Sequence, residues 1–450
     1  MSTPIYDFLK AYQRSGVSRL HMPGHKGVPR LGPEGLDITE IRGADELYEA
    51  SGIIAESEAN AARLFGTGCT LYSTEGSSHA IRSMILLAAQ KYAGHGRTIL
   101  AARNAHKAFL YALALADCDA RWVYPAGDAE NSAAACGMTP EALEEALRQA
   151  DREGNPPFAV YVTSPDYLGR RTDIAGLSAV CRAHGLPLLV DGAHGAYLHF
   201  LPERQHPMDL GAAMCCDSAH KTLPVLTGGA YLHLAPGVAS IPEAKAAMEM
   251  TGTTSPSYLI MASLDLANGL LMENYPARFA ELADRLDAWK AARRAEGIPL
   301  LQGERLKVAT DAGTMGFTGG ELGDVLRACG GEPEFCDVRY LVCMLTPENT
   351  PEDLDRLAEA LRRAAGEKRP ARSGMSLHLR PLERRMSIRE AVLAPHEILP
   401  LDRAEGRICG APTVSCPPAI PLAVSGEILD RRVLDLMAAY GITEVSTVRE

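Results

Sequence analysis

The sequence has no apolar run long enough to cross a membrane as a helix, which excludes a helical membrane protein. Its first residues have neither a basic stretch nor an apolar core, so we expect no signal peptide and a cytoplasmic protein. Paired Cys-x-x-Cys motifs are missing, and the eleven cysteines are scattered, which is typical of reduced, mostly buried thiols. Positive charge is in deficit, and a net charge of −11 argues against a nucleic-acid partner.

What the sequence does contain is an ordinary globular balance, with 46% hydrophobic and 22% charged residues. Its 450 residues are enough for two or three domains, and they show no internal repeat. We expect an N-terminal segment (1–50), a large domain (51–275), a small α/β domain (276–370) and a C-terminal domain (371–450).

Predicted strands alternate with predicted helices through the large domain, and polar clusters follow the ends of the strands. This alternation predicts an α/β fold with a mostly parallel sheet. Open sheets of this kind bind ligands along the carboxyl ends of their strands, so we look for the functional residues there.

Lys221 is the first candidate for chemistry. It follows Ser218 and His220 and is set among small and apolar residues. Desolvation and a nearby cation both lower the pKa of a lysine, which frees the amine to attack a carbonyl. The alternative is an ordinary solvated surface lysine.

Asp191 is the second candidate. Residues 186–190 form a short apolar run that predicts a buried strand, and Asp191 stands at its carboxyl end. The alternative is a turn or cap aspartate before Gly192. A lysine that forms a Schiff base and an aspartate that holds a pyridinium nitrogen are the two groups that pyridoxal phosphate needs most.

A third segment predicts an anion site. The strand at 71–73 runs into Gly76-Ser77-Ser78, and an apolar helix is expected from residue 80 to 92. Backbone N–H groups, the helix dipole and two hydroxyls would then face an anion. The spacing matches neither a P-loop nor a dinucleotide fingerprint, and plain capping by Ser77 or Ser78 is the alternative.

Taken together, the motifs resemble the Orn/Lys/Arg decarboxylase family, the fold-type-I pyridoxal-phosphate enzymes of bacterial basic amino-acid metabolism. The resemblance spans residues 21–421 and fits the short form without an N-terminal wing domain. It implies an aspartate-aminotransferase-like large domain with a mostly parallel seven-stranded sheet, and small α+β C-terminal domains. The most specific motifs are Pro23-Gly24-His25-Lys26, Arg103-Asn104-Ala105-His106-Lys107, Asp191-Gly192-Ala193-His194-Gly195, Ser218-Ala219-His220-Lys221-Thr222 and Thr254-Ser255-Pro256-Ser257-Tyr258.

The resemblance also implies a role for each motif residue. Lys221 would hold the cofactor aldehyde, Asp191 would pair with the pyridine nitrogen, and His106 would stack on the ring. His220 or Lys221 would return a proton to Cα, and no metal is expected. The other expected contacts are Gly76, Ser77, Ser78, Ser218 and His220 around the phosphate, His194 beside the ring, Thr163 or Ser164 at the phenolic oxygen, and Thr254 and Ser255 in the site of a partner subunit.

The chain departs from the family's usual motifs at several positions. Glu75 replaces an asparagine in the phosphate turn, and Gly192 replaces the glutamate of Asp-Glu-Ala-His-Gly. In the tail, Cys416 and Ala419 break the pattern Tyr-Pro-Pro-Gly-Ile-Pro. Because tail segments approach the substrate pocket in this family, we expect this pocket to suit a different length of side chain.

The resemblance implies a homodimer with shared active sites that decarboxylates arginine, lysine or ornithine to the amine. Asp45, Glu46 and Glu427 are the expected acidic partners of the cationic side chain. Transamination or β-elimination on the same fold, or cofactor binding without turnover, are the alternatives. An aminotransferase would need an arginine to hold the α-carboxylate. Such a salt bridge would hinder decarboxylation, because it stabilises the carboxylate charge that must disappear. The candidates for that arginine are Arg339, Arg380 and Arg407.

Overall fold

The computed structural model describes residues 2–92, 94, 96–125, 131–132, 135–372, 378–412 and 420–450. The chain forms two compact units. The first unit comprises Met1–Gly94 and Cys181–Arg278, and the second comprises His95–Val180 and Phe279–Glu450.

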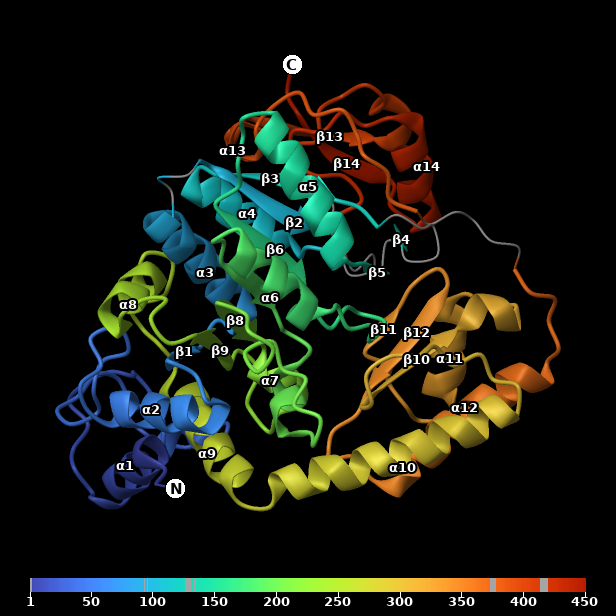
Figure 1. Ribbon diagram of the computed structural model, residues 1–450. Coiled ribbons are helices and arrows are strands. Elements are labelled where there is room, and N and C mark those ends of the chain that lie inside the picture. The colour runs from blue at the N-terminus through green and yellow to red at the C-terminus, as the bar shows by residue number, and fades with distance from the viewer. Residues whose placement is uncertain are drawn as a thin grey trace. The chain divides into compact units, whose positions relative to one another are not determined.

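The largest sheet has seven strands, in the order β1-β9-β8-β7-β6-β2-β3 (Figure 1). Strand β7 is parallel to β8, and β2 is parallel to both β3 and β6, whereas β9 is antiparallel to β1 and β8. The expected seven-stranded, mostly parallel sheet is confirmed. Its strands are β1 (Cys69–Ser73), β2 (Thr98–Ala102), β3 (Asp119–Val123), β6 (Ala159–Thr163), β7 (Leu188–Asp191), β8 (Met214–Asp217) and β9 (Ala230–Leu234).

Apolar faces of helices build the core of the first unit. Helix α3 (Gly76–Tyr92) buries Ile81, Met84 and Ile85 against β8, β9 and α8 (Ile241–Glu249). Helix α2 ends at Gly66 because this glycine takes the left-handed conformation, with φ +66°. The remaining elements of this unit include α1 (Pro4–Arg14), η1 (Pro33–Gly35), α2 (Ile53–Phe65), η4 (Ala196–Phe200), α7 (Ala219–Thr222) and α9 (Tyr258–Met272), and α6 (Ile174–Ala183) and α10 (Tyr275–Ala295) cross the boundaries between units.

Among its described residues, the second unit adds three smaller antiparallel sheets (Figure 1). Strands β10 (Lys307–Asp311), β12 (Tyr340–Met344) and β11 (Phe335–Cys336) form the first sheet. Strand β13 (His396–Pro400) pairs with β14 (Glu444–Val448) in the second, and β4 (Asn131–Ser132) pairs with β5 (Ala135–Cys136) in the third. The other elements are α4 (Lys107–Ala116), α5 (Pro140–Arg152), η5 (Ala312–Met315), α11 (Gly319–Ala328), α12 (Pro351–Gly366), α13 (Ile388–Leu393), η6 (Leu401–Arg403) and α14 (Arg431–Ala439).

One helix start differs from its prediction. The sequence predicts a helix from residue 80, whereas α3 begins at Gly76, whose φ of +71° turns the chain directly into the helix. Ser77 and Ser78 therefore lie in the first helical turn, and capping from outside the helix is the wrong interpretation.

Nine described cysteines carry free thiols, as expected. No helix in the described part of the chain is both long and apolar enough to cross a bilayer.

Candidate active site

Lys221 and His194 meet in the first unit, although 27 residues separate them. Lys221 lies on the single turn of α7, and its Nζ is 2.9 Å from Nε2 of His194. His194 is 5% exposed and follows the strand that ends at Asp191. The structure thus brings two of the predicted motifs into direct contact.

Asp191 is the last residue of β7 and is only 2% exposed. Its Oδ1 accepts a hydrogen bond from the Ala193 N–H at 3.1 Å and lies 3.7 Å from the Cys216 Sγ on β8. Because β7 and β8 are parallel, their carboxyl ends lie at one edge of the sheet, and the residues of α7 follow directly from β8. The buried carboxylate therefore stands at the predicted edge.

The predicted anion turn brings Ser77 and Ser218 together. The Ser218 hydroxyl donates to Oγ of Ser77 at 2.7 Å, and the Gly76 N–H donates to the Gly228 carbonyl at 2.7 Å. The His220 ring is fixed by a 3.0 Å hydrogen bond between Nδ1 and the Gly229 carbonyl. Together with Ser78 in the same first turn, these groups surround the amino end of α3, where N–H groups and the helix dipole favour an anion.

Thr254 and Ser255 lie on an exposed loop that leads into α9. The Ser255 N–H donates to Oγ1 of Thr253 at 3.1 Å, and the Thr253 N–H donates to Oε1 of Glu75 at 2.7 Å. Glu75, one of the departures from the family's motif, stands directly before the anion turn. Its side chain therefore connects this loop to that turn. The two hydroxyl-bearing residues are presented outwards from a fixed segment.

The second unit holds the other three predicted contacts. His106 caps α4, and its Nδ1 accepts the Ala108 N–H at 3.2 Å, so the neutral ring carries its proton on Nε2. Ser164 Oγ accepts the Thr172 N–H at 3.1 Å. Thr163 Oγ1 is buried and has no hydrogen-bond partner among the described residues. Of the two alternatives for the phenolic oxygen, Thr163 thus has the hydroxyl that could form a hydrogen bond with the cofactor without breaking one in the protein.

These groups fit pyridoxal phosphate. An amine, a buried carboxylate and a helix amino end with two serines match an aldehyde, a pyridine nitrogen and a phosphate. Within the described ranges, the buried hydroxyls of Thr222 and Thr251 in the first unit also make no hydrogen bond. Since buried polar groups are nearly always hydrogen-bonded, unpaired hydroxyls beside the lysine and in the loop before Thr254 are consistent with a polar ligand.

Two of the expected acidic partners serve the backbone. The Asp45 carboxylate accepts the N–H groups of Ser51, Gly52, Ile54 and Ala55. Burial acts to raise the pKa of Asp45, but backbone hydrogen bonds such as those from Ser51 and Gly52 lower it. Glu46 accepts the N–H groups of residues 48 and 49. Glu427, in the second unit, is 4% exposed, and burial raises its pKa against the opposing charge of Arg103.

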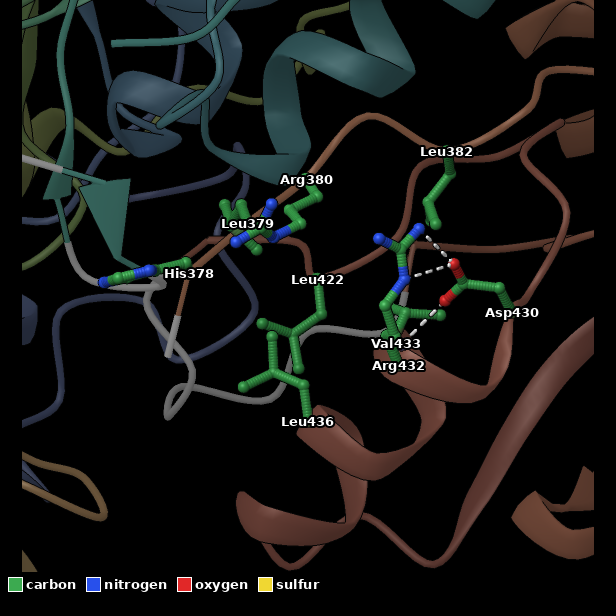
Figure 2. Close-up of a pocket in the computed structure, with 9 residues that line it drawn as sticks. All are labelled: His378, Leu379, Arg380, Leu382, Leu422, Asp430, Arg432, Val433 and Leu436. Carbon is green, nitrogen blue, oxygen red and sulfur yellow. Dashed lines mark hydrogen bonds and ion pairs between the residues drawn. The ribbon is translucent and has the colours of Figure 1, made fainter. Parts of the chain in front are cut away.

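The three arginines considered for an aminotransferase have different surroundings. Arg339 is bound by Asp311 at 2.7 Å, and Arg407 is bound by Glu397 at 2.6 Å. Arg380 lines a pocket of about 190 Å³ in the second unit (Figure 2). In that pocket Asp430 is already paired with a second arginine, Arg432, at 2.7 Å. Cys416 and Ala419 lie outside the described residues.

Sequence reasoning missed a buried cluster beside the lysine motif. Asp217, the residue before Ser218, lies between the imidazoles of His206 and His233. The only signal was a histidine inside the apolar run of β9 and a charged residue at the end of β8. Neither signal identifies the partner, because the three residues come from different elements.

Comparison with solved structures confirms the fold class. A lysine decarboxylase of Francisella novicida superposes with a TM-score of 0.80 at 16% identity, covering 99% of this chain and 81% of that one. The constitutive lysine decarboxylase of Escherichia coli gives a TM-score of 0.76 at 18% identity, covering 99% and 80%.

Comparison of sequences identifies the family. The arginine decarboxylase of Bacillus subtilis (strain 168) is 30% identical and covers 95% of this chain and 91% of its own length. The arginine decarboxylase of Halalkalibacterium halodurans is 29% identical, with 95% and 91% covered. The family described as Orn/Lys/Arg decarboxylase, major domain, matches residues 3–310. The expected enzyme class, a pyridoxal-phosphate-dependent amino-acid decarboxylase, is confirmed, and the chain belongs to the Orn/Lys/Arg decarboxylase family.

Proposed function

We propose that this basic amino-acid decarboxylase acts on arginine, removing its α-carboxyl group to give the amine and carbon dioxide. The observation that carries the proposal is the contact of Lys221 with His194, in the same unit as the buried Asp191. The choice of arginine is supported by relatives named arginine decarboxylase that match 95% of the chain.

Each part of the cofactor would have its own protein group. When bound, pyridoxal phosphate supplies the electron sink for the pair of electrons that the departing carboxylate leaves behind. Lys221 would hold the aldehyde, and the amino end of α3 with Ser77 and Ser218 would hold the phosphate. Asp191 would hold the ring nitrogen, and its negative charge favours the protonated form of that nitrogen.

The same residues would exclude water and carry protons. Asp191, His194 and Thr222 are each at most 5% exposed, so these side chains are shielded from bulk water. His194 holds a ring nitrogen 2.9 Å from Lys221 Nζ, within reach for proton exchange with the amine. Lys221 or His220 would return the proton to Cα after the carboxylate leaves. His106 stays a predicted contact of the ring, and Thr163 of its phenolic oxygen.

The test is to supply the purified protein and pyridoxal phosphate with arginine, lysine or ornithine labelled in the carboxyl group. We expect labelled carbon dioxide and the matching amine, with the highest kcat/KM for arginine. Protein with Lys221→Ala is the control and should release no labelled gas. Release only from lysine or ornithine would contradict the choice of arginine. Formation of a keto acid without labelled gas would replace decarboxylation with transamination.

A further inference from the structure

Asp217 is a buried carboxylate that the proposed chemistry does not use. Its Oδ2 lies 2.8 Å from Nε2 of His206 and 3.0 Å from Nε2 of His233, and all three side chains are 0% exposed. His233 belongs to β9, and His206 belongs to the loop that precedes β8. We call these three residues the Asp217 triad.

The neighbours of the triad fix the direction of its hydrogen bonds. Nδ1 of His206 accepts the Met208 N–H at 3.3 Å, so Nε2 carries the proton and donates it to Asp217. His233 Nδ1 lies 2.8 Å from the Thr70 hydroxyl on β1. Although burial acts to raise it, the charge and hydrogen bonds of the two histidines hold the pKa of Asp217 well below its usual range. The carboxylate is thus a buried anion with two donors.

A metal ion is the competing explanation, since the ligand atoms of the three residues lie within 4.8 Å of one another. A histidine that binds a metal usually donates its other ring N–H to an acceptor. In His206 the other nitrogen already accepts the Met208 N–H, so its Nε2 is protonated and cannot bind a metal. Hydrogen bonds alone account for the geometry.

The triad also explains why Gly192 departs from the family's motif. A Cβ at position 192 would lie 2.7 Å from Oδ1 of Asp217 and 2.8 Å from Sγ of Cys215. No side chain fits there without displacing the carboxylate. Asp217 therefore occupies the space that a side chain at position 192 would need.

The triad is placed where it can set the position of Lys221. Asp217 ends β8, and Lys221 follows four residues later on α7, which has only four residues. A helix of four residues is not stable by itself, because forming the first helical turn is unfavourable. Its geometry must come from its anchors, and the Asp217 carboxylate ties its amino end to β9 and, through His233, to Thr70 on β1.

We propose that the Asp217 triad is a positioning element that fixes the Lys221 segment relative to Asp191. The proposal rests on the proposed function, since it takes Lys221 as the residue that holds the cofactor. The triad touches no reacting atom. Its loss is expected to displace the amine, and a shift of about 1 Å at a reacting group can cost about 100-fold in rate.

The test is Asp217→Asn, which keeps the shape of the side chain but removes the negative charge that both imidazole donors share at Oδ2. We expect folded protein that binds pyridoxal phosphate with an altered visible spectrum. We also expect slower borohydride fixation onto Lys221 and a kcat about 10-fold to 100-fold lower, with KM changed less than about threefold. If Asp217→Asn is insoluble, His233→Gln, which keeps one donor, is measured instead.

The matched control is His199→Gln. His199 is buried, pairs with Asp209 at 2.9 Å and has its ring 5.4 Å from the Phe65 ring, which also contacts His206 and His233. It should lower the thermal midpoint without changing the spectrum or kcat. The proposal would be overturned if the two variants changed the spectrum and kcat to the same extent. It would also be overturned if the wild type held stoichiometric zinc that Asp217→Asn lost. A wild type that binds no pyridoxal phosphate would instead refute the proposed function.

Discussion

At the scale of single residues, protein neighbours hold the side chains that we propose for the chemistry. Lys221 contacts His194, and Ser218 contacts Ser77, each through a hydrogen bond between segments far apart in the sequence. Because such groups are placed before a ligand arrives, less ordering is needed when it binds. The segments that carry Lys221, His194 and Ser77 are therefore parts of one preformed arrangement in the first unit.

The proposed chemistry depends on Lys221, the residue that would hold the cofactor. Borohydride treatment of the protein with pyridoxal phosphate should fix the cofactor to the peptide that contains Lys221, because only an amine forms a reducible bond with the aldehyde. Lys221→Ala should abolish this labelling and the release of carbon dioxide. Peptide mass spectrometry is the measurement. Lys26→Ala, in the exposed loop 21–27, is the control, and labelling that survives Lys221→Ala would refute the assignment.

At the scale of elements, the ends of strands and helices determine where polar groups gather. Thr139 caps α5 and Pro140 takes the first helical position, as the sequence predicts. The segment after β6 is a different case, because it buries a carboxylate. Asp166 is 7% exposed and accepts the Arg170 N–H at 2.8 Å.

Burial raises the pKa of Asp166 to about 6, so this carboxylate should destabilise the fold at neutral pH. The folded state binds the proton more tightly than the unfolded state, so the stability from this group is present below about pH 4 and is lost as pH rises through about 6. Asp166→Asn should therefore gain about 1–3 kcal/mol relative to wild type between pH 4 and pH 7. Denaturant unfolding at both pH values measures it, with the exposed Asp173→Asn as control. An equal difference at both pH values would contradict the prediction.

At the scale of the whole molecule, each compact unit carries part of the predicted site. The first unit contains Lys221, Asp191 and the exposed loop with Thr254 and Ser255, and the second contains His106. The division into segment 1–50 and domains 51–275, 276–370 and 371–450 stays a prediction, as does the homodimer. Family resemblance predicts that the exposed loop completes the site of a partner subunit, which would make the active unit a dimer.

A mixture of two inactive proteins tests the shared site. Lys221→Ala is mixed with a protein that carries Thr254→Ala and Ser255→Ala, and heterodimers are isolated. One of the two sites then combines an intact lysine with an intact loop, so we expect up to about half of the wild-type activity. Lys221→Ala mixed with Asp191→Asn is the control, since one unit supplies both residues and neither site is intact. Verified heterodimers without recovered activity would contradict a shared site.

Sequence reasoning reached the sheet, most of its flanking helices and the motif residues, because these depend on local pattern. The apolar run before Asp191 and the proline after Thr139 each determine a short segment through hydrophobic burial or backbone geometry alone. It could not assign the role of Asp45, which stands near the predicted site in sequence. The structure shows that its carboxylate is bound by four backbone N–H groups, which depends on how the loop folds.

By itself, the sequence determined the family, the cofactor and the alternation of strands and helices. These are recorded in short motifs and in periodic burial, which need no knowledge of distant contacts. Only the tertiary structure decided that α3 starts at Gly76, that His194 contacts Lys221, and that Asp217 lies between His206 and His233. The physical reason is that hydrogen bonds act over about 3 Å in space. Lys221 and His194 are 27 residues apart in the chain and Ser218 and Ser77 are 141 apart, so folding alone brings them together.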